Sequence, residues 1–108
     1  MFTTNALAYD IAVKNANGVT IYYDYINNGA ELAVTSNNNA YKGIVNIPEE
    51  VTYNGKTRKV TSIEVGAFQE CNDLTSVTIP NSVINIEAWA FTFCRNLTSV
   101  KIGNSVKV

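Results

Sequence analysis

Side chains that could carry out catalysis are few in this sequence, and they are scattered along it. Histidine is absent, which removes the commonest general base and the commonest protein ligand for metals. Among the nine carboxylates, Glu49 and Glu50 are adjacent and would diverge on a strand, whereas a glycosidase-type site needs two carboxylates facing each other across a cleft. The glycines are isolated and form no phosphate-binding loop. The sequence therefore predicts a protein that is not an enzyme, with no catalytic residues, no metal site and no cofactor.

Composition limits the remaining classes of function. The chain has 108 residues, enough for one domain, and 46% of them are hydrophobic, so an ordered core is expected. A net charge of −1 gives no electrostatic reason to bind nucleic acid or an anionic membrane, and no apolar run is long enough to span a bilayer. Residues 1–8 end in a small-x-small pattern that resembles a signal cleavage site but lack the preceding charged and apolar regions. A signal remnant and a chance tripeptide both stay open.

An internal repeat of 23 residues organises the C-terminal half. Residues 61–83 (TSIEVGAFQECNDLTSVTIPNSV) align with residues 84–106 (INIEAWAFTFCRNLTSVKIGNSV), and 13 of the 23 positions are identical. The matches include the pairs Phe68 and Phe91 and Val77 and Val100. Because one repeat cannot bury its own apolar side, we expect successive coils to stack, with their strands parallel and the two phenylalanine rings in one column.

A partial repeat precedes the two full copies. Residues 44–51 match the strand and the Pro-containing end of the repeat, but they lie nine residues further away than one repeat length. The extra segment, residues 52–60, contains Asn54-Gly55, and this dipeptide between strand-like residues is a strong β-hairpin signal. We therefore expect a hairpin insertion between the partial repeat and the clean coils. Between the parallel strands we expect short helical turns, with Glu64 and Glu87 at their starts.

The repeats resemble the BspA-like, or Treponema-type, leucine-rich repeats of bacterial surface proteins. The family pattern runs roughly A-F-x-x-C-x-x-L-x-x-V-x-I-P-x-S-V-x-x-I, and the second copy departs from it at Gly103, where the family has proline. The resemblance is strong over residues 44–108. It implies a secreted or surface-anchored role in adhesion or recognition, without cofactor or reaction. The residues that carry it in the first copy are Ala67, Phe68, Cys71, Leu74, Val77, Ile79, Pro80, Ser82, Val83 and Ile86.

The segment before the repeats has a different pattern. Residues 9–35 combine β-branched and aromatic residues with Asn-Gly turn signals, which predicts an antiparallel β-meander, and residues 36–43 are a polar loop. We interpret residues 9–43 as a cap over the first apolar layer of the stack, in preference to a binding subdomain built on its tyrosines. The predicted fold is thus of the α/β class: a fragment of a leucine-rich-repeat solenoid with a short parallel sheet, short helical turns and an N-terminal antiparallel β cap.

Cys71 and Cys94 occupy equivalent positions in the two repeats. Equivalent side chains of stacked coils project in parallel, whereas a disulfide needs a roughly perpendicular torsion. Free, buried thiols are therefore favoured over a bridge, and two thiols alone make a poor zinc site.

Two groups of residues are candidate contacts. Trp89 and Phe93 replace Gly66 and Glu70 of the first repeat, so the stack does not require aromatic rings there. We favour gap filling over contact for the two rings, although exposed aromatic residues are common at interaction hot spots. The outward face of the parallel sheet is a second candidate, with simple solvation as its alternative: Asn46, Ser76, Thr78, Ser99 and Lys101.

Two functions follow from these features. The first is a bacterial extracellular or cell-surface module that binds a protein or glycan on another surface, through adhesion or protein–protein interaction. The alternative is a structural spacer or cap fragment of a longer repeat protein. In that case residues 84–108, with an open apolar side, would form a homodimer or another self-association.

Overall fold

The computed structural model describes residues 9–107, which form nine strands. The proposed signal remnant, residues 1–8, lies outside the described residues. Within residues 9–107 no helix could cross a membrane. The strands are β1 (Ile11–Lys14), β2 (Thr20–Ile26), β3 (Glu31–Thr35), β4 (Gly43–Asn46), β5 (Glu50–Tyr53), β6 (Lys56–Ile63), β7 (Leu74–Ile79), β8 (Asn85–Ile86) and β9 (Ser99–Ile102).

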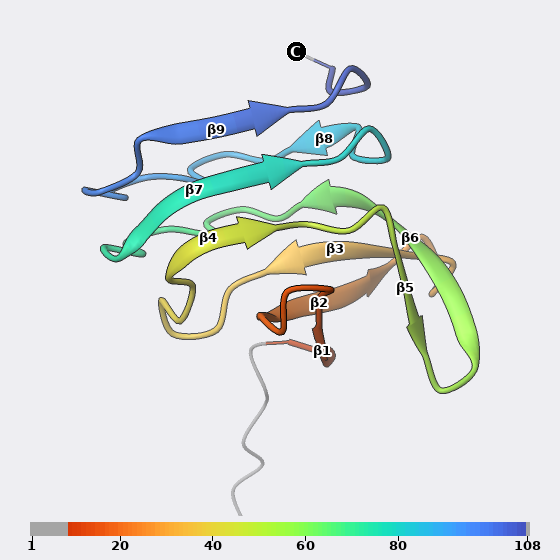
Figure 1. Cartoon of the computed structure of the whole chain (residues 1–108). Helices are drawn as coiled ribbons and strands as arrows, with labels where there is room; N and C mark the ends of the chain where they lie inside the picture. Colours follow the sequence, from red (N-terminus) through yellow and green to blue (C-terminus); the bar gives the residue numbers. More distant parts are fainter. Residues whose placement is uncertain (1–8, 108) are drawn as a thin grey trace, which may run out of the picture.

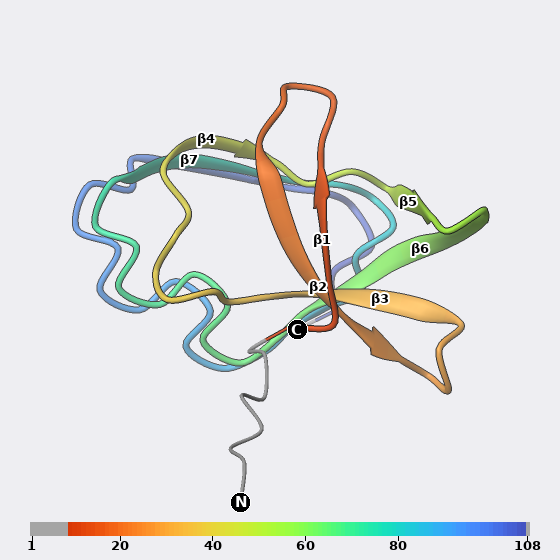
Figure 2. The ribbon, with the colours of Figure 1, turned by 90° about the horizontal axis from the view of Figure 1, so that it is seen from below.

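These strands form two sheets that enclose a common core (Figures 1 and 2). The larger sheet has the order β1-β2-β3-β6-β5, with β8 also paired to β6, and the smaller sheet has the order β4-β7-β9. Successive coils contribute one strand to each sheet, as β3 and β4, then β6 and β7, then β8 and β9. All pairings between coils are parallel.

The register of the smaller sheet confirms that the repeats stack. Val77 on β7 pairs with Val100 on β9, one repeat length later, and Val45 on β4 pairs with Val77 on the other side. The three valines therefore occupy one position in three successive coils. The sequence repeat and the spatial repeat are the same unit.

The N-terminal strands are joined to the stack through β3. β1, β2 and β3 pair antiparallel as a meander, and β3 then pairs parallel with β6, so it is also the first strand of the first coil. β5 and β6 form an antiparallel hairpin that extends away from the stack (Figure 1). Its turn is Asn54-Gly55, with both residues at positive φ, 51° and 77°, as this hairpin type requires.

The predicted α/β class and its short helical turns are wrong: residues 9–107 form strands and tight turns and contain no helix. In an α-helix each amide donates to the carbonyl four residues earlier. The first turn segment connects β6 to β7, and the second connects β8 to β9. In the first turn segment every second amide donates instead to the next coil, at distances of 2.8–3.1 Å. These bonds run from Gly66, Phe68 and Glu70 to the carbonyl oxygens of Ala88, Ala90 and Thr92.

Left-handed backbone conformations also exclude a helix from these segments. Gly66 and Glu70 have φ values of 65° and 58°, and their equivalents Trp89 and Phe93 have values of 61° and 60°. A positive φ cannot occur within a right-handed helix. The segments are chains of tight turns that lie in register from coil to coil.

A column of aromatic rings runs through the stack and continues into the meander. Phe68 and Phe91 are stacked with a centroid distance of 5.1 Å and an interplanar angle of 3°, which confirms the predicted pair. Tyr41 packs against Phe68 at 4.6 Å, and Tyr22 packs against Tyr41 at 5.7 Å. We call these rings and Tyr9, which lies 4.8 Å from Tyr22, the aromatic column. Tyr41 and Phe68 are buried.

The presence of glycine at position 103, where the family pattern has proline, has a steric reason. A Cβ atom at Gly103 would lie 2.7 Å from the backbone carbon of Pro80 and 2.7 Å from Oδ1 of Asn81 in the coil below. Such distances are below van der Waals contact. The neighbouring amide of Asn104 donates to the same Asn81 oxygen at 2.8 Å, so this corner is held tightly against the previous coil.

Candidate functional site

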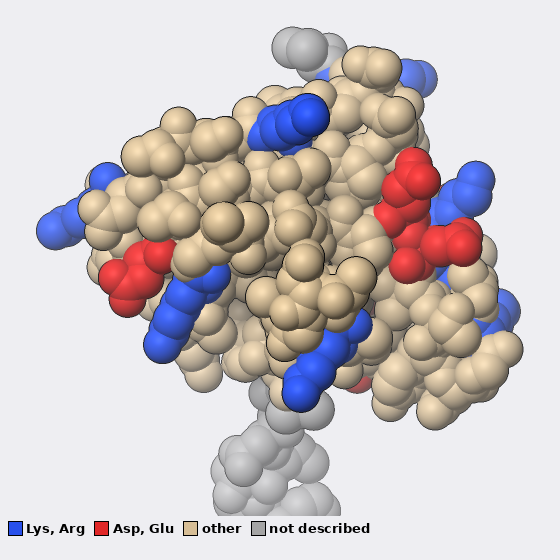
Figure 3. Space-filling model, viewed as in Figure 1, with Lys and Arg blue, Asp and Glu red and all other residues tan. Residues whose placement is uncertain are grey.

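The five polar residues predicted on the sheet face lie on the three strands of the smaller sheet. Thr78 is paired with Asn46 on one side and with Lys101 on the other, and Ser76 is paired with Ser99. The structure therefore places the five residues in two rows across adjacent strands. Figure 3 looks onto this side of the molecule and shows charged side chains of both signs in small, separate groups on a mainly uncharged surface.

Asn46 is occupied by contacts within the chain. Its backbone carbonyl accepts a hydrogen bond from Asn15 Nδ2 at 2.9 Å, and its side-chain Nδ2 donates to Asn17 Oδ1 at 2.9 Å. The turn between β1 and β2 thus holds the outer strand, β4, of the smaller sheet. The other four predicted residues take no part in these two hydrogen bonds.

Sequence reasoning missed Ile44 on this face. Ile44 pairs with Ser76 and therefore begins the row that continues to Ser99. Its side chain is 63% exposed. The alternation with buried Val45 was the available signal, since neighbouring residues on a strand point to opposite faces.

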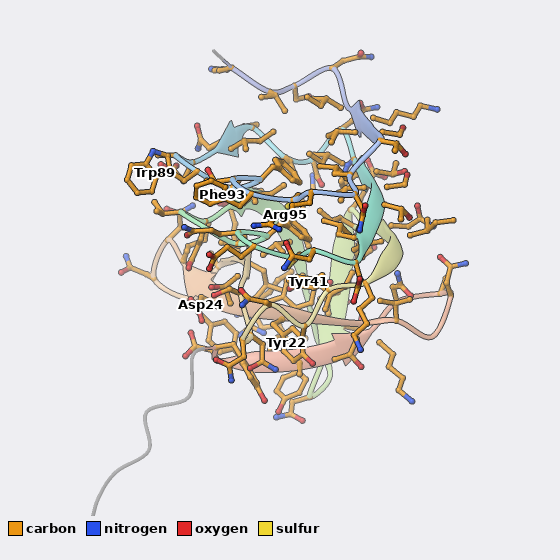
Figure 4. All side chains as sticks on the ribbon, turned by 90° about the vertical axis from the view of Figure 1, so that its left-hand side faces the viewer. Tyr22, Asp24, Tyr41, Trp89, Phe93 and Arg95 are labelled. Atoms are coloured by element: carbon orange, nitrogen blue, oxygen red, sulfur yellow. The ribbon has the colours of Figure 1, made fainter. Side chains whose placement is uncertain are left out.

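Trp89 and Phe93 lie at the surface of the second turn segment. Figure 4 shows them on the edge that faces left in Figure 1, with Arg95 further along the same coil. Their side chains are 69% and 66% exposed, so they cover little of the protein beneath them. Both rings are attached to left-handed backbone, which is rare for bulky residues.

A surface pocket adjoins Phe93. It has a volume of about 350 Å³ and lies where the turn segments lead into β7 and β9. Its walls come from three successive coils, from the segments that precede β4, β7 and β9: Asn39, Glu70, Asn72, Phe93 and Arg95. The pocket thus combines an aromatic ring with a carboxylate, a guanidinium group and two amides.

Glu64 does not begin a helix, and its environment is acidic. Burial raises the pKa of Glu64 to about 7, and hydrogen bonding to Asp24 and the negative charges of Asp24 and Asp10 act in the same direction. A contact with Thr35 acts in the opposite direction. The backbone amide of Glu64 donates to the carbonyl of Val34 at 2.9 Å, which fixes the main chain of this residue against β3.

Glu64 should make the stability of the fold depend on pH. A raised pKa in the folded state means that stabilisation is complete below the unfolded pKa of about 4.5 and is lost as pH rises through about 7. After allowance for solvent screening, we expect a loss of about 1 kcal/mol between these pH values. Glu64→Gln should remove this loss in urea unfolding measured at pH 5 and pH 8. Glu87→Gln, at the exposed equivalent position, is the control, and an equal effect there would contradict the assignment.

Both cysteine thiols are free, with Cys71 buried and Cys94 half-buried. Burial raises the pKa of each thiol, which keeps it protonated and unreactive. Cys94 Sγ donates to the carbonyl oxygen of Phe68 at 2.9 Å, so the thiol forms a bond between coils. Among residues 9–107 no group of three or more Cys, Asp or Glu side chains could hold a metal ion.

The chain belongs to the BspA-type leucine-rich repeat family. A family model described as "BspA type Leucine rich repeat region (6 copies)" matches residues 36–108, more than half of the sequence. The match begins directly after β3 and therefore covers β4 of the first coil and both following coils. No curated protein matches the chain.

Solved structures with the same fold come from several bacteria. A leucine-rich repeat protein from Bacteroides ovatus is 31% identical with a TM-score of 0.75, over 92% of this chain and 25% of that protein. One from Bacteroides capillosus is 32% identical with a TM-score of 0.68, over 85% of this chain and 65% of its own. A leucine-rich cell surface protein from Faecalibacterium prausnitzii is 24% identical with a TM-score of 0.67, over 89% and 24%, and shares the fold. The chain thus spans from about a quarter to just under two thirds of these proteins.

Proposed function

We propose that the chain is a non-enzymatic recognition module that is secreted or displayed on a bacterial surface and binds a protein or glycan on another surface. The exposure of Trp89 and Phe93 on left-handed backbone carries this proposal. Left-handed backbone costs about 1–2 kcal/mol for a residue with a Cβ atom. Large exposed rings at such positions reduce stability without filling the core.

A comparison of the two repeats supports the view that folding does not need these rings. Gly66 occupies the position equivalent to Trp89, and Glu70 occupies the position equivalent to Phe93, with the same sign of φ. Residues that cost stability and have no structural task are characteristic of functional sites. Aromatic side chains are also the commonest hot-spot residues of binding surfaces.

The surface location is proposed from the family and from its solved members, one of which is described as a cell surface protein. In this proposal the coils are a fragment of a leucine-rich-repeat solenoid, and the N-terminal strands β1 to β3 form its cap. The hydrogen bonds that join Asn46 to Asn15 and Asn17 support the capping role, because they attach the turn between β1 and β2 to the outer strand of the smaller sheet.

Trp89→Asn should raise stability and weaken binding in the same variant. Asparagine tolerates left-handed backbone better than tryptophan, so the free energy of unfolding should rise by about 1 kcal/mol. Fluorescently labelled protein should bind saturably to cultured epithelial cells or to bacterial cells in flow cytometry, and the variant should bind about tenfold more weakly.

Val65→Ser is the matched control, because Val65 is 64% exposed and belongs to the first turn segment. It should bind like the parent protein. Absence of saturable binding to either cell type, or equal binding by the parent and Trp89→Asn, would refute the proposed module.

A structural spacer that self-associates is the second candidate function. Val100 and Ile102 on β9 are 36% and 52% exposed, whereas their equivalents Val77 and Ile79 on β7 are at most 1% exposed. A following coil or a second copy would cover them. Light scattering at increasing concentration should then show assemblies that Ile102→Lys abolishes, and a monomer at every concentration would exclude this role.

A further inference from the structure

The pocket beside Phe93 contains the chemical groups that recognise a neutral sugar. Phe93 offers one exposed apolar ring, and Arg95, Glu70, Asn39 and Asn72 surround it with hydrogen-bonding groups. Amides both donate and accept, the guanidinium group donates, and the carboxylate accepts. A pyranose ring presents the matching surface, because its C–H face can lie on an aromatic ring while its hydroxyl groups donate and accept at the edge.

From this match we infer that the pocket lined by Phe93, Arg95, Glu70, Asn39 and Asn72 binds a neutral pyranose unit of a glycan. The inference rests on the proposed recognition function and gives it a ligand class. The volume of about 350 Å³ is at the lower end of the range for small-molecule sites, which suits one sugar ring with its neighbours left in solvent.

Charge decides between a neutral sugar and other ligands. The positive charge of Arg95 is balanced within the pocket by Glu70, so an acidic sugar or a phosphate would meet a carboxylate as well as a guanidinium group. A peptide anchor would need an apolar cavity for a side chain, whereas four of the five lining residues are polar. A ligand with many hydroxyl groups and no charge fits this set best.

Hydrogen bonds between coils hold the walls of the pocket in place before any ligand arrives. The amide of Glu70 donates to the carbonyl of Thr92 at 2.8 Å, and Asn96 Nδ2 donates to the carbonyl of Asn72 at 2.7 Å. Asn39, Glu70 and Phe93 all have φ values close to 60°. These bonds join the two coils that supply Glu70, Asn72, Phe93 and Arg95, so little ordering of these walls is required when a ligand binds.

Titration of the ¹⁵N-labelled chain with neutral methyl pyranosides tests the inference. The probes are the methyl glycosides of glucose, galactose, mannose and N-acetylglucosamine. At least one should bind with a dissociation constant of about millimolar, as expected for a ligand of this size. It should shift amide signals of residues 70–73 and 93–96 and leave those of the β5–β6 hairpin unchanged.

Two variants separate ring stacking from hydrogen bonding. Phe93→Asn, which keeps a residue that tolerates positive φ, and Arg95→Met should each weaken binding about tenfold or more. Val65→Ser should leave the affinity unchanged. Each variant's ¹⁵N spectrum reports whether the fold is retained.

Three results would overturn the inference: no shift with any neutral glycoside, unaltered affinity in Phe93→Asn, or stronger binding of glucuronate or a sulfated glycoside. Cell binding that depends on Trp89 but is not inhibited by any of the pyranosides would refute the sugar site and leave the recognition module standing. If the parent protein binds neither cells nor any of the pyranosides, the recognition module and the sugar site are both refuted.

Discussion

Phe68→Ala is expected to destabilise the fold by about 3–5 kcal/mol, a large part of the stability of a small domain. The ring is fully buried and lies between Phe91 and Tyr41, with centroid distances of 5.1 and 4.6 Å. Its removal leaves a cavity and breaks the aromatic column at the junction of the first and second coils. Urea unfolding followed by circular dichroism gives the change in the free energy of unfolding.

Phe91→Ala is the matched comparison, because Phe91 is the same residue one coil later but is only half-buried. Its loss should cost less, about 1–3 kcal/mol, in proportion to the smaller area removed from water. Equal effects at the two positions would contradict the assignment of Phe68 as the central ring.

Tyr41→Ala should destabilise the fold by a similar amount, about 3–5 kcal/mol. Tyr41 is 2% exposed, and its hydroxyl group donates to the carbonyl of Thr35 at 2.6 Å and accepts from the amide of Tyr22 at 3.1 Å. The residue therefore fills the aromatic column and also joins the meander to the first coil. Thermal and urea unfolding measure the effect.

Tyr41→Phe divides this effect into its two parts. The ring remains, but the buried carbonyl of Thr35 and the part-buried amide of Tyr22 each lose a partner, which should cost about 1–3 kcal/mol. A Tyr41→Phe variant as stable as the parent would show that the hydroxyl bonds do not hold the meander to the coils.

The repeat made the stack of coils predictable. Identical apolar residues at a fixed spacing are expected to occupy equivalent positions in successive coils, which is why the pairing of Val77 with Val100 and the stacking of Phe68 on Phe91 follow from the sequence. The Asn54-Gly55 turn was predictable for a different reason, since few dipeptides adopt positive φ at both positions.

The turn segments were harder to predict, because their conformation depends on the neighbouring coil. Residues 87–91 are compatible with a helix by local propensity, but their carbonyl groups accept hydrogen bonds from the coil below. Tyr41 was assigned to a polar loop, since only a single aromatic residue marks its place among polar neighbours. Its burial comes from contacts with Tyr22 and Phe68, which are distant in sequence.

The exposed position of Trp89 and Phe93 also depends on backbone geometry. Aromatic residues that replace glycine and glutamate are visible in the repeat alignment, and from the alignment we favour gap filling over contact for both rings. Both residues have positive φ, as do their equivalents Gly66 and Glu70 in the preceding coil, and both rings are exposed.

The hydrogen bonds between the turn segments give the stack a polarity. The amides of Gly66, Phe68 and Glu70 donate towards the following coil, and by the repeat the amides of Trp89, Phe91 and Phe93 point the same way. Two copies related by a twofold axis through this end would bring donors against donors. The free amides of the turn segments therefore match a following coil, whose carbonyl groups face back towards them, better than they match the same segments of a second copy in twofold symmetry.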